Sequence, residues 1–148
     1  MHEPETAATS VAQRLLAPGG PVDRWAAGRV RWGPARPVLD PADRRPTAWF
    51  VPAVVGDVLL GYALVEPDGR LRRWSTFQRQ PGGLAGCPPA AGWLDPEVVR
   101  DLARRAGEPG ESGDPFLSFD GVPDQLAWAV PVGNGLVFVA GTAVWARG

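Results

Sequence analysis

The strongest apolar pattern of the chain covers residues 48–77, where runs of Val, Leu and aromatic residues are separated by short turn sequences. Gly56-Asp57 is typical of a tight hairpin turn. Pro67-Asp68-Gly69 predicts a second turn, because proline presets φ and glycine tolerates a positive φ. The pattern predicts a three-stranded antiparallel meander, with strands at 48–55, 58–66 and 71–77. The middle strand is apolar on both faces, so we expect it to be central.

The third strand of this meander mixes charged and apolar positions on both faces. One face would carry Arg70, Arg72, Trp74 and Thr76, and the other Leu71, Arg73, Ser75 and Phe77. Such a mixture suits a strand at the edge of a sheet, where charged side chains oppose unwanted pairing. Pairing of this edge with a second copy of the chain would give a homodimer.

Two helices are expected from capping residues followed by apolar residues at helical spacing. Ser10 begins a capping-box pattern, and Pro18-Gly19-Gly20 stops this first helix. Asp95 caps a second helix, with Pro96 in its first turn and Gly107 in the stop position. The second helix carries one apolar stripe, formed by Val98, Val99, Leu102, Ala103 and Ala106.

The remaining segments follow weaker patterns. Residues 23–27 suit a helical turn, and residues 30–32 suit a short strand. Prolines recur between Pro34 and Pro46 and predict a connecting loop, because each removes a backbone donor. Residues 78–94 are rich in Gly and Pro and predict a linker. Further strands are expected at 116–119, 126–132 and 136–145, the last two joined by Gly133-Asn134-Gly135.

Together these elements predict a single α+β domain over residues 1–148. Its halves, 10–77 and 95–145, each run from a helix into antiparallel strands, giving one sheet or two packed sheets with two main helices. Trp49-Phe50-Val51-Pro52 matches Trp128-Ala129-Val130-Pro131 at an offset of 79 residues, which makes the halves candidates for an internal duplication. The alternative is chance similarity between valine-rich strands. If the halves are duplicates, a cleft at their pseudo-twofold axis is the natural ligand site.

The first helix, the strands at 48–55 and 58–66 and the turn Pro67-Asp68-Gly69 resemble the helix-and-meander unit of PepSY-type domains. The resemblance covers about forty residues and consists mainly of hairpin sequence features. It implies a small noncatalytic module, often appended to peptidases or regulating them. PepSY-type proteins are usually exported or membrane-attached, and this chain shows no signal of either kind.

Composition argues against several classes of protein. Fifteen arginines, no lysine and sixteen acidic residues give a net charge of −1, whereas nucleic-acid-binding proteins usually carry excess positive charge. The sequence shows no signal-peptide pattern and no apolar run long enough to span a bilayer, so we expect a cytoplasmic protein without membrane contact. Export after removal of a signal absent from this sequence stays open. The single cysteine, Cys87, fits a reducing compartment.

Candidate catalytic chemistry is sparse. Cys87 is the only cysteine and His2 the only histidine, so neither a Cys–His nucleophile nor a zinc site is expected. Cys87-Pro88 has the order of a thiolate haem ligand, but its surroundings favour a plain loop, and no cofactor is expected. Residues 82–86 are glycine-rich but lack the Lys and Ser/Thr of a phosphate-binding loop. Carboxylates near strand ends could form an acid/base pair, although turn positions explain them equally well: Asp57, Glu66, Asp68, Asp120 and Asp124.

Arginine and tryptophan side chains are the preferred binding candidates. Trp74 lies among Arg70, Arg72 and Arg73 on the expected edge strand, and Trp93 borders a loop. Exposed Trp and Arg dominate binding hot spots, because they stack on planar groups and pair with carboxylates. The alternative is that the arginines protect the edge while Trp74 covers the core.

These features favour a noncatalytic cytoplasmic binding module that recognises a protein or peptide. Two alternatives stay open. An immunity-type inhibitor of a toxin would use the acidic loop of Glu108, Glu111 and Asp114. A small enzyme or metabolite-binding protein would use the cleft between the halves, with carboxylates or Tyr62 as acid/base groups.

Overall fold

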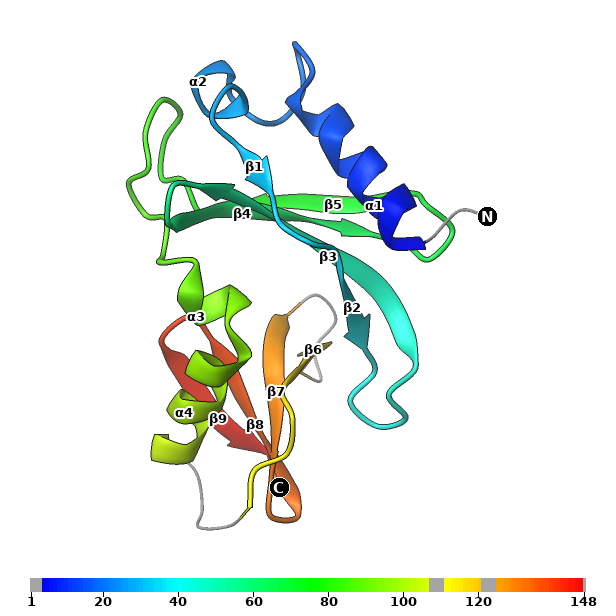
Figure 1. The fold of residues 1–148 in the computed structure, drawn as a ribbon, viewed down its shortest axis with the longest axis vertical. Helices are drawn as coiled ribbons and strands as arrows, with labels where there is room; N and C mark the ends of the chain where they lie inside the picture. The colour runs from blue at the N-terminus through cyan, green and yellow to red at the C-terminus, as the bar shows by residue number, and fades with distance from the viewer. Residues whose placement is uncertain (1–3, 107–110, 121–124, 148) are drawn as a thin grey trace. The chain divides into compact units, whose positions relative to one another are not determined.

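The computed structural model describes residues 4–106, 111–120 and 125–147, and it confirms the α+β fold class (Figure 1). The two longer helices are α1 (Pro4–Gln13) and α4 (Pro96–Ala106). The chain forms two compact units. The first contains Met1–Pro37 and Pro46–Pro88, and the second contains Val38–Arg45 and Pro89–Gly148. Residues 38–45, assigned above to the half 10–77, thus belong to the second unit.

The expected meander is present in the first unit. Its strands are β3 (Pro46–Val55), β4 (Val58–Val65) and β5 (Leu71–Thr76), with β4 between the other two and β5 at the edge. A short strand, β1 (Arg31–Trp32), pairs with β3 and confirms the strand expected there. The turn glycines Gly56 and Gly69 have φ values of 61° and 92°, a region that favours glycine.

Helix α1 packs on β3 and β4 of the first unit. Buried residues of α1 and of the turn after it recur at helical spacing: Ala8, Val11, Ala12 and Leu15. They share a core with buried residues of both strands: Val51, Ala53, Val55, Leu60, Ala63 and Val65. The N-cap expected at Ser10 is wrong, because α1 begins at Pro4 and Ser10 lies inside it. Proline suits the first turn of a helix, and alanine has the highest helix propensity. Pro4 and the alanines that follow it in α1 therefore support this earlier start.

Two further helical turns complete the first unit. A 3-10 turn, η1 (Arg14–Leu16), continues α1. The helical turn expected at residues 23–27 is confirmed as α2 (Arg24–Ala27), with Asp23 as its N-cap.

In the second unit, β6 (Phe116–Phe119) and β7 (Leu126–Val132) have the expected bounds. The single strand expected at 136–145 is wrong. Gly141 takes a positive φ of 64° and separates β8 (Gly135–Ala140) from β9 (Ala143–Arg147). These four strands pair antiparallel in chain order.

The loop expected between Pro34 and Pro46 contains a strand, β2 (Arg36–Leu39), so that expectation is wrong in part. Val38 of β2 pairs in parallel with Leu117 of β6. The Ser118 hydroxyl also donates to the Leu39 carbonyl at 2.6 Å. Pairing with a segment far along the chain overrides the local effect of the prolines.

Helix α4 packs against β7, β8 and β9, with Val99 and Ala103 fully buried. The Asp95 carboxylate accepts the Glu97 N–H at 3.0 Å, whereas the expected stop at Gly107 lies outside the described residues. A short helix, α3 (Ala91–Leu94), lies at the end of the expected linker. None of the helices in the described ranges is long and apolar enough to cross a membrane. The duplication of the two halves stays a prediction.

Candidate functional site

The expected arginines Arg70 and Arg72 are both held in ion pairs. Arg72 contacts Glu66 at two points, Nε to Oε1 at 2.8 Å and Nη2 to Oε2 at 3.1 Å. Arg72 Nη2 also donates to the Thr47 carbonyl at 3.3 Å. The hydrogen bond from Arg72 holds the pKa of the Glu66 carboxyl below its ordinary value. Arg70 pairs with Asp68 at 2.9 Å in the turn before β5, where both side chains are exposed.

Trp74 packs on the core of the first unit. Its ring meets Trp32 edge to face, with the ring centroids 6.2 Å apart. Gly61 of β4 makes room for this arrangement, because a Cβ there would lie 2.9 Å from Trp74 Cη2 and 2.2 Å from the Ser75 carbonyl oxygen. Trp74 is half-buried, so it covers the core without being fully removed from solvent.

The candidate residues of β5 share one strand but not one face. Trp74 pairs with Ala63 and Arg73 pairs with Leu64, so Trp74 and Arg73 point to opposite faces. The strict alternation expected over residues 70–77 is wrong near Arg72. There the ladder passes directly from Arg73 to Leu71, and Arg72 is the extra residue of a bulge.

Two other candidates are core residues. Trp93 is 5% exposed, and its carbonyl accepts the Trp128 indole N–H at 2.7 Å. The exposure expected for Trp93 as a binding residue is therefore wrong, because α3 places its ring inside the second unit. Tyr62 is 7% exposed and packs against Phe50 and Phe77 in the first unit.

The outer side of β5 is a sheet edge with no neighbouring strand in the part of the chain that the structure describes. The Phe77 N–H donates to the Leu60 carbonyl at 2.8 Å. This bond shows which backbone N–H groups near the end of β5 point toward β4 and which point away from it. By the alternation of an antiparallel ladder, the N–H groups of Trp74 and Thr76 point away from β4. Leu71 is 41% exposed on the same strand.

Asp23 joins α2 to the loop that follows β5. Its carboxylate accepts from the Ala26 N–H at 3.1 Å, the Gln78 side-chain amide at 2.8 Å and the Gly82 N–H at 3.3 Å. Burial raises the pKa of Asp23, but the hydrogen bonds to its carboxylate together lower it by more, so its pKa lies below the ordinary value. Burial also raises the pKa of the Cys87 thiol, which keeps it protonated at neutral pH.

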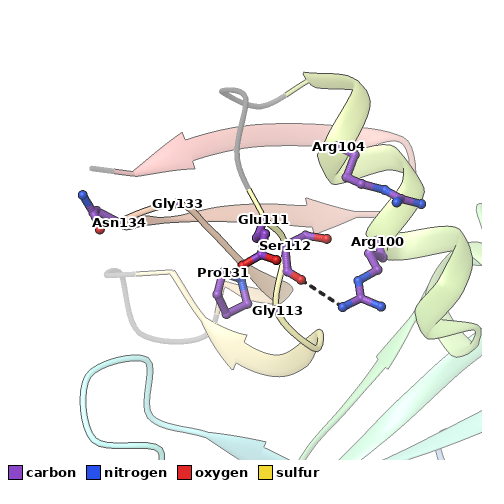
Figure 2. Close-up of a pocket in the computed structure, with 8 residues that line it drawn as sticks. All are labelled: Arg100, Arg104, Glu111, Ser112, Gly113, Pro131, Gly133 and Asn134. Atoms are coloured by element: carbon purple, nitrogen blue, oxygen red, sulfur yellow. Dashed lines mark hydrogen bonds between the residues drawn. The ribbon is translucent and has the colours of Figure 1, made fainter.

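A second candidate site is a hollow of about 850 Å³ in the second unit, between α4, the segment 111–113 and the β7–β8 turn (Figure 2). It is lined by Arg100, Arg104, Glu111, Ser112, Gly113, Pro131, Gly133 and Asn134. The Gly113 N–H donates to the Pro131 carbonyl at 2.7 Å, and the Gly133 N–H donates to the Glu111 carbonyl at 3.2 Å. These bonds fasten the segment to β7. Of the lining residues, the sequence patterns point only to Glu111.

The Arg100 side chain is positioned by a hydrogen bond to a backbone carbonyl at the rim of the hollow. Its Nη2 donates to the Ser112 carbonyl at 2.9 Å, the bond drawn in Figure 2. The nearest carboxylates are distant, with Asp114 at 3.6 Å and Glu97 at 3.9 Å, and both are largely exposed. Arg104 lies 3.6 Å from Asp101. These ion pairs are long and their carboxylates are exposed, so they contribute little to stability, and both arginines keep most of their capacity to bind an anion.

The carboxylates expected as acid/base candidates take part in turns and pairs wherever they are described. Asp57 is exposed in its turn, and Glu66 and Asp68 bind arginines. Asp120 is 3% exposed and accepts a hydrogen bond from the Trp145 indole. Besides Gly107, three residues named in the sequence analysis lie outside the described residues: His2, Glu108 and Asp124. Across the described ranges, no group of three or more His, Cys, Asp or Glu side chains could hold a metal ion.

Comparisons with protein-family models, with curated proteins and with solved structures found no match to this chain. The resemblance to PepSY-type domains therefore stays a prediction.

Proposed function

We propose that this protein is a noncatalytic binding module that recognises a protein or peptide by adding an extended segment of that partner to the edge of β5. The observation that carries the proposal is the outward direction of the Trp74 and Thr76 N–H groups on a strand with one neighbour among the described residues. Backbone groups at such an edge pair readily with an extended segment, which gives affinity without a deep pocket.

Side chains beside the edge would supply the specificity. Leu71 is exposed and offers apolar surface, and the half-buried Trp74 offers an aromatic side chain. Between residues 66 and 76 there are three arginines and two carboxylates, so the edge has a small excess of positive charge. A partner strand that combines acidic and apolar residues would complement this surface.

The proposal is tested by a pair of substitutions at one position. Thr76→Pro removes an outward N–H and puts a ring in the path of an added strand, while the neighbours Ser75 and Phe77 keep their bonds to β4. Thr76→Ala keeps the N–H and serves as the matched control. Both variants lose the hydrogen bond from the Thr76 hydroxyl to the Leu60 carbonyl, so that loss cancels in the comparison.

The measurement is capture of partners from the native lysate by the tagged protein, followed by mass spectrometry. We expect a protein that the wild type and Thr76→Ala retain, and that Thr76→Pro retains at least about tenfold less, a difference of about 1.4 kcal/mol. Equal retention by the proline variant would contradict strand addition. A wild-type dimer that becomes a monomer in Thr76→Pro would identify the partner as a second copy of the chain.

A further inference from the structure

We infer that the hollow beside α4 binds a small molecule through an oxyanion, either a phosphate ester or a carboxylate. This inference concerns the second unit and does not depend on the binding proposed for β5. It is carried by the placement of two arginines on one wall of the hollow and by the hydrogen-bonding groups that face them.

Arg100 and Arg104 are four residues apart, so they lie one helical turn from each other on α4. Each directly follows a fully buried residue, Val99 or Ala103, which places both arginines beside the packed side of the helix. Both line the hollow, as Figure 2 shows. Two guanidinium groups at this spacing can contact different oxygens of one anion.

The Arg100 guanidinium is fixed before any ligand arrives. Its side chain is 26% exposed, and the bond to the Ser112 carbonyl sets the plane of the group. Its Nε is buried and has no hydrogen-bond partner among the described residues. A guanidinium that is already oriented and partly removed from water binds an oxyanion with little further loss of side-chain freedom.

The other lining groups set the charge and size of the ligand. Glu111 is the single acidic residue of the lining set, while Glu97, Asp101 and Asp114 lie outside it, each within 4 Å of one of the two arginines. A bound oxyanion would therefore compete with these carboxylates for the two guanidinium groups. Ser112 also lines the hollow, and its hydroxyl group can donate a hydrogen bond. The side chain of Asn134 points away from the other groups in Figure 2, and we assign it no part in binding. The hollow of about 850 Å³ is widely open to solvent, so it has room for a ligand larger than a bare phosphate ion and does not enclose it.

The test is a titration followed by two-dimensional NMR of amide and arginine Nε resonances, at low ionic strength because salt screens such contacts. The probes are inorganic phosphate and citrate, each added to the full chain. We expect saturable shifts at Ser112, Gly133 and Arg100 Nε, with a dissociation constant below about 10 mM. Saturation by phosphate assigns a phosphate ester, and saturation by citrate assigns a carboxylate. No saturable shift with either probe overturns the inference.

Variants distinguish binding at a specific site from nonspecific attraction of an anion to the protein's positive charges. Arg100→Gln and Arg104→Gln should each weaken binding at least about fivefold, as expected for loss of a charged hydrogen bond. The matched control is Arg45→Gln, because Arg45 lies in the same unit, is exposed, pairs with Asp43 at 3.8 Å and does not line the hollow. An equal loss in the control would overturn the site.

Glu111→Gln guards against effects of misfolding, because it should improve binding. Removing the lining carboxylate takes away a like-charge repulsion, and we expect about threefold tighter binding. A weaker or unchanged affinity in this variant would count against an oxyanion in the hollow.

Discussion

Gly61→Ala is the substitution for which the structure predicts the largest effect on the β5 edge. The added Cβ would lie 2.2 Å from the Ser75 carbonyl oxygen, 2.9 Å from Trp74 Cη2 and 3.0 Å from Thr76 Cα. Overpacking of this kind costs typically about 1–3 kcal/mol, and we expect about 3 kcal/mol because two of the three contacts are to backbone, which cannot rotate away. For a chain of this size the melting temperature should then fall by roughly 6–12 °C.

The assay is thermal unfolding followed by circular dichroism, with Gly28→Ala as the matched control. Gly28 has an ordinary φ of −77°, and a Cβ there would meet nothing within 4 Å, so this change should leave the melting temperature within about 2 °C of wild type. Adding Trp74→Ala to Gly61→Ala should give little rescue, because the clash with Ser75 remains. A Gly61→Ala variant that melts with the wild type would refute the close approach of β4 and β5.

Two further predictions concern carboxylates of the first unit. Glu66→Gln should lower the free energy of unfolding by about 1 kcal/mol at neutral pH, because it breaks a charged two-point contact. The folded-state pKa of Glu66 lies below its ordinary value of 4.5, so this stabilisation is complete above pH 4.5 and disappears as the pH falls through the folded-state pKa. The urea midpoints of wild type and variant should therefore converge in acid, and midpoints that stay equally far apart would contradict the pairing. Asp23→Ala should cost about 1–2 kcal/mol and speed amide exchange at Ala26 and Gly82. Asp43→Ala, which removes a bond within its own exposed turn, is the control, and unchanged exchange at both amides would refute the role of Asp23.

Local sequence signals predict the elements that depend on neighbouring residues. The meander from β3 to β5 follows from period-two apolar runs and two glycine turns, and α4 follows from its cap and its apolar stripe. Elements fixed by distant contacts do not follow in this way. β2 is a strand because Val38 pairs with Leu117, a contact that the prolines around it do not reveal.

The same distinction between local signals and distant contacts applies to the candidate sites. The β5 edge is visible in the sequence because its mixed faces are typical of an edge strand. The burial of Trp93 is not visible, because a tryptophan beside a loop looks the same whether its ring enters the core or leaves it. The hollow beside α4 is built from residues near 100, 112 and 132, and no local pattern links these three segments.

Amide hydrogen exchange along β5 reports directly on the addition of a partner strand at this edge. In the free protein the Trp74 and Thr76 amides should exchange faster than those of Arg73 and Ser75, because the first two point outward and the second two bond to β4. Binding of the captured partner should slow Trp74 and Thr76 by at least about tenfold and leave Arg73 and Ser75 almost unchanged. If Trp74 and Thr76 keep their free-state rates while the partner is bound, the partner does not add a strand at this edge.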